Sequence, residues 1–237
     1  MNKLSFGINK NYLKNFKNKK NLISNLLQIA LISEQIGINS ITINLSKNYK
    51  YIKKYINILK KIIQIYINFE IEIYDEILNT ILKIKPKSCY LFSKKKNEIT
   101  KEGGLNIINK FEEISIIVNL LNNNNIEAFL FIDPNLNQID AAINTGTKYI
   151  KLNTNMYSLA NNNLEKMFQF NKIKKSVIYA KKKGLIVNVG YGLNYENIKK
   201  LSKIKQINEF NISNSILNKG LFIGLKKAIK KILLLIN

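Results

Sequence analysis

The 237-residue chain has an ordinary hydrophobic share of 46%, but it contains no His, no Trp, one Cys and, among its 38 basic residues, no Arg. Without His it cannot build a Ser-His-Asp or Cys-His catalytic group or a histidine metal site, and one Cys excludes an internal disulfide and a zinc cluster. The net charge of +23 is typical of nucleic-acid or membrane binders, but dedicated nucleic-acid readers favour the bidentate Arg.

The composition itself offers a simpler explanation of the charge. Lys, Asn, Ile, Tyr and Phe are abundant, and their codons are rich in AT, so we infer drift toward AT as in a long-term intracellular bacterium; a functional electrostatic field is the alternative. The sequence has no evident signal peptide, and its longest late apolar stretch, 232–236, is far below the roughly 20 residues of a membrane span. We expect a cytoplasmic protein that binds neither nucleic acid nor membrane.

Short β-rich runs alternate with helical segments along the chain. The pattern predicts, in order, a strand at 4–9, a helix at 21–36, a strand at 40–45, a helix at 51–63, a strand at 66–70, a helix at 75–84, a strand at 88–92, a polar loop, a helix at 111–121, a strand at 126–132, a helix at 135–144, a strand at 149–152, a helix at 164–183, a strand at 185–189, a helix at 194–204, a strand at 209–212 and a helix at 218–234.

Eight strand-helix units favour an α/β fold, the (β/α)8 TIM barrel, which forms a single domain over residues 1–237. A doubly wound open sheet is the alternative, but it usually has fewer strands and a glycine-rich first turn, which residues 9–12 lack. In a barrel, the chemistry lies where the strands end. The candidates at these ends are Asn9, Asn44, Glu70, Ser93, Asp133, Asn153, Tyr191, Ser213 and Asn214.

Glu70 directly follows an apolar run, so we expect partial desolvation to raise its pKa and suit it to act as a general base. The alternative is a Glu at the rim paired with a neighbouring Lys. Lys151 shares the strand parity of Tyr149 and Asn153. It could form a Schiff base with a ketone, but among so many lysines we favour a side chain that extends out of the mouth into water.

Two glycines flank Tyr191 at the end of the seventh predicted strand, and Ser213 and Asn214 end the eighth. In such barrels the loops after strands seven and eight often bind phosphate through backbone N–H groups. A plain turn is the alternative, because a lone Gly-x-Gly is a weak signal.

Several segments, in order over nearly the whole chain, resemble the pyridoxine 5'-phosphate synthase family of the bacterial deoxyxylulose-dependent vitamin B6 pathway. The most specific is the Glu-x-Thr-x-Glu-Gly-Gly-Leu run at 98–105; the others are 7–9, 33–37, 41–43, 68–70, 130–133, 187–193 and 209–212. The resemblance implies a (β/α)8 barrel, commonly an octamer, that uses no cofactor. Its reaction condenses 1-deoxy-D-xylulose 5-phosphate with 3-amino-2-oxopropyl phosphate to pyridoxine 5'-phosphate, inorganic phosphate and water.

The resemblance assigns roles residue by residue. Asn9 matches a ligand-contacting asparagine, Glu70 the catalytic glutamate, Thr100 a substrate-binding threonine, and Gly192 a glycine at the aminoketone phosphate. The two catalytic His positions of the family hold Asn44 and Tyr191, and its strand-six glutamate is Lys151. Other substrate-binding positions, where the family has Asp, His, Arg or Gly, hold Asn11, Tyr12, Lys20, Ser46, Tyr51, Ser213 and Asn214.

These departures leave two hypotheses. In the first, the chain is a synthase with slowed chemistry, in which Glu70 is the base, Tyr191 a substitute acid and Asn44 a hydrogen-bond donor to substrate. Tyr191 can donate a proton but is a poor base at its reference pKa of about 10, and Asn44 cannot exchange one. In the second, the chain is an inactive barrel that binds phosphorylated metabolites or partner proteins. In the first hypothesis, the phosphate cradle consists of Gly192, Ser213 and Asn214.

Overall fold

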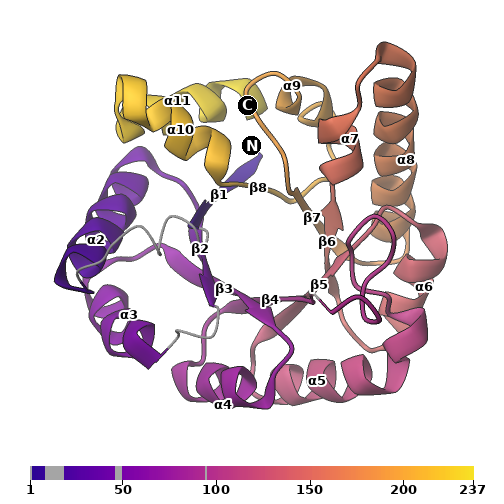
Figure 1. The fold of residues 1–237 in the computed structure, drawn as a ribbon, viewed down its shortest axis with the longest axis horizontal. Helices are drawn as coiled ribbons and strands as arrows, with labels where there is room; N and C mark the ends of the chain where they lie inside the picture. Colours follow the sequence, from indigo (N-terminus) through magenta and orange to yellow (C-terminus); the bar gives the residue numbers. More distant parts are fainter. Residues whose placement is uncertain (1, 9–18, 46–49, 94) are drawn as a thin grey trace.

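The computed structural model describes residues 2–8, 19–45, 50–93 and 95–237. Eight parallel strands pair in sequence order, and β8 pairs back onto β1, so the sheet closes into a barrel. This confirms the predicted TIM barrel. Figure 1 shows the ring of strands surrounded by an outer ring of helices. The strands are β1 Lys3–Ile8, β2 Ser40–Leu45, β3 Tyr66–Glu72, β4 Ser88–Phe92, β5 Glu127–Ile132, β6 Tyr149–Asn153, β7 Ile186–Gly190 and β8 Glu209–Ile212.

The helices follow the strands around the barrel. They are α2 Lys19–Ile36, α3 Lys50–Ile62, α4 Asp75–Ile84, η1 Ile108–Lys110, α5 Phe111–Asn123, α6 Leu136–Asn144, α7 Asn155–Leu159, α8 Asn163–Lys182, α9 Ile198–Leu201, α10 Asn214–Ile223 and α11 Leu225–Ile236. α7 was not predicted, and α9 is shorter than the predicted helix at 194–204. The single helix predicted at 218–234 is wrong: two helices meet at Gly224, whose φ of 78° breaks the helical path.

The outward faces of the strands hold the hydrophobic core. Phe6, Ile43, Phe69, Leu130 and Leu152 are completely buried between the barrel and the helices. Fully burying a side chain of this size contributes about 1.5–3 kcal/mol. This layer explains the apolar residues at alternate strand positions, because every second residue packs against a helix.

The inward faces are polar. Register pairs Asn44 with Glu70, Glu70 with Tyr90, Lys151 with Asn188, and Asn188 with Glu209, so these side chains share the barrel interior. TIM-barrel interiors are usually dominated by branched aliphatic residues. A polar interior must satisfy its own hydrogen bonds, and these bonds define the floor of the site described below.

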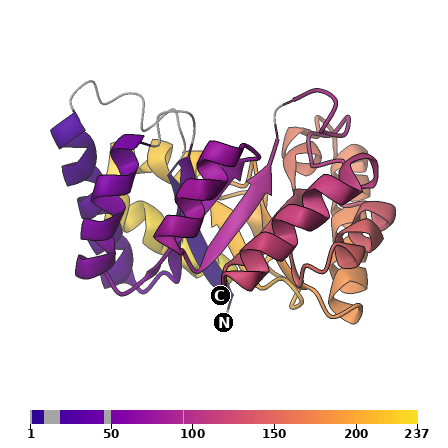
Figure 2. The same ribbon diagram turned by 90° about the horizontal axis from the view of Figure 1, so that it is seen from below.

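The two ends of the chain lie together at one end of the barrel in Figure 2. There the backbone N–H of Asn2 donates to the side-chain oxygen of Asn237 at 2.9 Å. The strands point away from this end, so their carboxyl ends form the opposite mouth. Within the described ranges, no helix is both long and apolar enough to cross a lipid bilayer.

Candidate functional site

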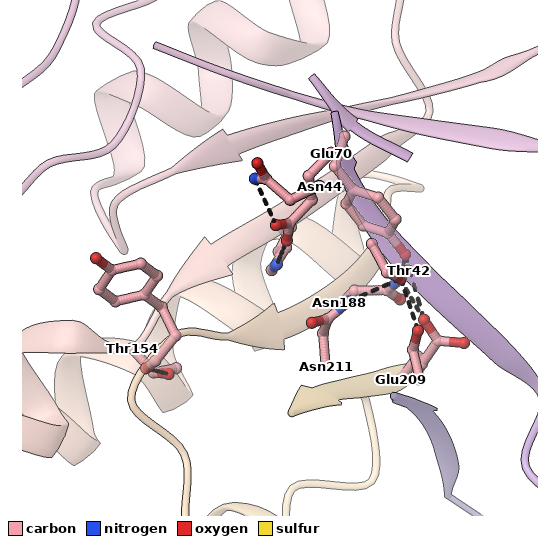
Figure 3. A network of polar contacts seen from close by, with 11 residues as sticks. Thr42, Asn44, Glu70, Thr154, Asn188, Glu209 and Asn211 are labelled. Carbon is pink, nitrogen blue, oxygen red and sulfur yellow. Dashed lines mark hydrogen bonds and ion pairs between the residues drawn. The ribbon is translucent and has the colours of Figure 1, made fainter. Parts of the chain in front are cut away.

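Three side chains from three strands meet in the mouth of the barrel. Lys151 of β6 donates from Nζ to Glu70 Oε1 of β3 at 2.5 Å, and Asn44 of β2 donates from Nδ2 to the other oxygen, Oε2, at 3.4 Å. Figure 3 shows the Asn44–Glu70 contact together with the polar residues Thr42, Asn188 and Asn211 of the barrel. Because a carboxylate only accepts hydrogen bonds, the amide must turn its nitrogen toward Glu70. The oxygen of Asn44 is buried and has no hydrogen-bond partner among the described residues.

Lys151 does not extend into water, and that prediction is wrong. Its side chain is only 4% exposed. The ammonium lies 5.3 Å from the ring centre of Tyr90 and 5.5 Å from that of Phe131, which favours a cation through their negative faces. Gly190 makes room for it, since a Cβ there would lie 2.9 Å from Lys151 Cε. The strand parity read from the sequence was correct, and the ion pair with Glu70 holds the side chain inside.

The pKa of Glu70 is lowered, not raised as predicted. Burial alone raises the pKa of this carboxyl, but the charge of Lys151 and the hydrogen bonds from Lys151 and Asn44 together outweigh burial. Glu70 is thus an ionised carboxylate at neutral pH. Its side chain retains 26% exposure, so it faces both the ion pair and the mouth.

A hydrogen-bonded floor lies beneath this group. Asn188 donates to the Tyr90 hydroxyl at 2.9 Å and to Glu209 Oε1 at 3.3 Å, and Tyr90 donates to the same oxygen at 3.2 Å. Ser40 donates to Glu209 Oε2 at 3.3 Å. Burial raises the pKa of Glu209 and raises that of Tyr90 well above its usual value. These side chains form hydrogen bonds with each other, so we regard them as structural support for the site.

The loop after β4 is fastened across the ends of β5 and β6 by Asp133. Thr100 donates from its hydroxyl to one oxygen of Asp133, and the other oxygen accepts from the Gly104 N–H at 3.1 Å and from Asn153 at 3.0 Å. Gly104 is required, because a Cβ there would lie 2.5 Å from the Asp133 nitrogen. Thus the predicted strand-end residues Asp133 and Asn153 serve to hold Thr100 at the mouth.

Two further contacts complete this loop. Glu102 accepts from Lys172 of α8 at 2.5 Å, while its second oxygen is buried and has no hydrogen-bond partner within the described part of the chain. Ser93, another predicted strand-end candidate, donates to Glu98 at 2.6 Å within the loop. Both contacts shape the loop.

The loop after β7 carries Tyr191 in a left-handed conformation, with φ at 89°. The Thr154 hydroxyl donates to the Tyr191 carbonyl at 2.6 Å, and the Tyr191 ring, 60% exposed, lies 6.0 Å from the Phe131 ring, centre to centre. The adjacent Gly192 has φ at 76° and packs on α7: a Cβ there would lie 2.0 Å from Ser158 Oγ. Missing α7 in the sequence meant missing this contact.

The loop after β8 lies beside the loop after β7. The Ser215 hydroxyl of α10 donates to the Leu193 carbonyl at 2.8 Å. Ser213, half-buried, lies close to β1, where a Cβ on Gly7 would be 3.0 Å from its Cβ. Asn214 begins α10 and is exposed. The two loops predicted to bind phosphate are therefore neighbours at the mouth.

The structure brings together Asn44 and Glu70 and adds Lys151 to them. Tyr191 is linked to this group through the Phe131 ring, which contacts both Tyr191 and Lys151. Four predicted binding residues, Asn9, Asn11, Tyr12 and Ser46, lie outside the described residues. Lys20 and Tyr51 lie in α2 and α3, but their side chains are outside the described set. The inward polar floor was missed, although the polar residues at alternating strand positions were a signal for it.

Solved structures share the fold at low sequence identity. A tryptophan synthase α-subunit variant from Pyrococcus furiosus matches with a TM-score of 0.65 at 11% identity, covering 98% of this chain and 97% of that one. Phosphoribosyl anthranilate isomerase from Thermus thermophilus matches with a TM-score of 0.58 at 9% identity, covering 97% and 99%. At this identity the likeness concerns the fold alone.

Sequence relatives are much closer. Pyridoxine 5'-phosphate synthase of Blochmanniella pennsylvanica is 40% identical over 232 residues, covering 97% of this chain and 95% of the relative. The synthase of Aliivibrio fischeri is 33% identical over 231 residues, with the same coverage. The family model for the pyridoxal phosphate biosynthesis protein PdxJ matches residues 6–237. With the barrel closed and a carboxylate in its mouth, these matches establish that the chain belongs to the PdxJ family, whose curated relatives are pyridoxine 5'-phosphate synthases.

Proposed function

We propose that this chain condenses 1-deoxy-D-xylulose 5-phosphate with 3-amino-2-oxopropyl phosphate in the mouth of the barrel, releasing pyridoxine 5'-phosphate, inorganic phosphate and water. The observation that carries the proposal is the Glu70 carboxylate at the carboxyl end of β3, paired with Lys151 and still 26% exposed toward the mouth. It belongs to the segment 68–70 that resembles the family. An ionised, oriented carboxylate is able to remove a proton from a bound substrate.

The neighbouring residues supply the remaining interactions. Tyr191 donates a proton to a substrate oxygen in place of the family's imidazole. Because the nitrogen of Asn44 faces Glu70 and its oxygen has no hydrogen-bond partner among the described residues, Asn44 accepts a hydrogen bond from substrate rather than donating one. Thr100 contacts substrate from the loop fastened by Asp133. The phosphate groups bind at Gly192, Ser213 and Asn214, at the adjacent loops after β7 and β8.

A direct assay tests the proposal. Purified protein is mixed with both substrates, and pyridoxine 5'-phosphate is measured by fluorescence and mass spectrometry. We expect product from the wild-type protein and a fall in kcat of about 10²–10⁴ for Glu70→Gln, which keeps the shape of the side chain but removes the base. No product at high enzyme concentration would sink the proposal.

The replaced histidines favour a second candidate, an inactive barrel that binds phosphorylated metabolites. An asparagine at position 44 cannot exchange protons near neutral pH. This candidate predicts measurable heats of binding for 3-amino-2-oxopropyl phosphate in calorimetry, with no turnover when the second substrate is added. Turnover in the assay above excludes it.

We also infer a cytoplasmic homo-oligomer built from this single-domain barrel, as the family resemblance implies. Light scattering coupled to size-exclusion chromatography tests the assembly: a mass above the 27.4 kDa of one chain is expected, and a monomer at micromolar concentration contradicts it.

A further inference from the structure

Lys151 reverses the charge at one position of the mouth. The resemblance predicts a glutamate on strand six, which would place two carboxylates side by side. This chain instead has an ammonium 2.5 Å from Glu70 Oε1. Two neighbouring carboxylates repel each other, whereas an ammonium and a carboxylate form a stable pair that holds one proton donor and one proton acceptor.

The surroundings leave the donor usable. Lys151 has three N–H groups, and Glu70 Oε1 accepts one of them. The Tyr90 and Phe131 rings pack against the ammonium at 5.3 and 5.5 Å, and the side chain is 4% exposed, so little bulk water competes for its protons. The Glu70 carboxylate lies on the mouth side of the pair, because it retains the larger exposure. A substrate in the mouth would therefore meet Glu70 first, and its leaving group would reach the Lys151 ammonium directly behind that carboxylate.

We propose that Glu70 and Lys151 act as one coupled acid–base pair for the water-eliminating step, in which Lys151 supplies the proton for the departing water, whereas Tyr191 donates to a substrate oxygen elsewhere in the reaction. This inference rests on the proposed function, because it names a second acid, beside Tyr191, for that same reaction.

The step balances without an outside reagent. The Glu70 carboxylate removes a proton from a substrate carbon adjacent to a carbonyl or imine. The carbon–hydrogen electron pair forms a carbon–carbon double bond, and the neighbouring hydroxyl leaves with its electron pair. Lys151 gives that hydroxyl a proton, so it leaves as water. The pair now holds a carboxylic acid and a neutral amine, and transfer of one proton across the 2.5 Å contact restores both.

The same geometry argues against covalent catalysis by Lys151. The carboxylate accepts from an ammonium, and an ammonium has no lone pair with which to attack a carbonyl. A side chain committed to this contact donates protons instead of forming a Schiff base with the ketone.

Two substitutions at Lys151 separate proton donation from charge. Lys151→Arg keeps a permanent cation beside Glu70, but a guanidinium does not give up a proton. Lys151→Met keeps the length of the side chain and removes both the charge and the proton. We expect kcat of either variant to fall about 10²–10⁴-fold, with KM changed only a few-fold for Lys151→Arg. If Lys151→Arg is too bulky beside Gly190 and does not fold, Lys151→Met and its pH profile decide alone.

The pH dependence gives a readout that a purely structural role would not change. In the wild-type protein the acid limb of kcat/KM lies below the usual pKa range of a glutamate, because the ammonium stabilises the carboxylate. In Lys151→Met only the hydrogen bond from Asn44 still opposes burial, which is the largest effect on the pKa of Glu70, so the acid limb moves above about 4.3. In Lys151→Arg it stays low while kcat still falls.

The matched control is Lys87→Arg. Lys87 also lies next to a glutamate, Glu127 at 3.6 Å, and over an aromatic ring, Tyr66 at 4.6 Å, but it precedes β4 at the opposite end of the barrel. It should retain wild-type kcat.

Wild-type kcat in Lys151→Arg or in Lys151→Met overturns the acid–base pair while leaving the proposed function intact. An unchanged acid limb in Lys151→Met does the same. A wild-type protein that makes no product refutes the proposed function, and the inference falls with it.

Discussion

Removing the cation beside Glu70 should destabilise the fold in a pH-dependent way. Lys151→Met leaves the packing of the side-chain stem against Tyr90 and Phe131 largely in place but deletes the ammonium 2.5 Å from Glu70 Oε1. Breaking a buried ion pair by removing one partner costs about 3–5 kcal/mol, because a charge is left uncompensated. Glu70 keeps 26% exposure and can turn toward water, so we expect the lower end, about 3 kcal/mol at pH 7.5.

The sign of the pH dependence follows from the two pKa shifts. In the wild-type protein the folded pKa of Glu70 is lowered, so the stability from the pair is present above about pH 4.3 and is lost as pH falls through the folded pKa. In Lys151→Met, burial raises the pKa instead, and the penalty fades as the carboxyl becomes protonated. The difference in unfolding free energy should therefore shrink between pH 7.5 and pH 4.5.

Urea unfolding followed by circular dichroism measures both effects. The double variant Glu70→Gln/Lys151→Met removes both charges and should cost about 0–1 kcal/mol, far less than either single change. Lys87→Met, which breaks the exposed pair with Glu127 at 3.6 Å, is the control and should cost at most about 1 kcal/mol. A cost below about 0.5 kcal/mol for Lys151→Met, or a cost independent of pH, would refute the buried pair.

Three further predictions concern the loops and the floor. Gly192→Ala should lower the unfolding free energy by about 1–2 kcal/mol through backbone strain and by more through the clash of its Cβ with Ser158 Oγ, and it should raise KM for the aminoketone phosphate. Gly184→Ala isolates the strain in the same unfolding assay, because Gly184 has φ at 89° but no neighbour within 4 Å of a Cβ. Equal costs for the two variants would contradict the packing argument. Thr100→Val should lower the unfolding free energy by about 1–3 kcal/mol and raise KM, because it leaves Asp133 Oδ2 without the hydroxyl donor. Unfolding experiments and steady-state kinetics measure the two effects, and an unchanged KM would show that Thr100 does not contact substrate. Because burial raises the folded pKa of Glu209, wild-type stability should fall as pH rises from about 4.3 through that pKa, and Glu209→Gln should flatten this slope; identical slopes would mean that Glu209 is not desolvated.

The sequence alone determined the architecture. Runs such as 40–45 and 209–212, in which polar and apolar residues alternate, are short and are separated by helical segments. Eight such units favour a closed parallel barrel. It also placed Asn44, Glu70 and Tyr191 at the mouth, because the carboxyl ends of all the parallel strands meet at the same end of a barrel. The sequence did not reveal the break at Gly224, which depends on one backbone torsion. The helical periodicity continues across it, so α10 and α11 were predicted as one helix.

Only the tertiary structure decided the state of the mouth. Glu70 and Lys151 are 81 residues apart in sequence, and local pattern carries no information about a charge arriving from three strands away. Desolvation read from the run before Glu70 predicted a raised pKa. Burial is the largest single effect on this carboxyl, but the charge of Lys151 and the hydrogen bonds from Lys151 and Asn44 together outweigh it and lower the pKa. Closing the barrel placed the cation next to that base, and it is this proximity that decides which groups can carry protons.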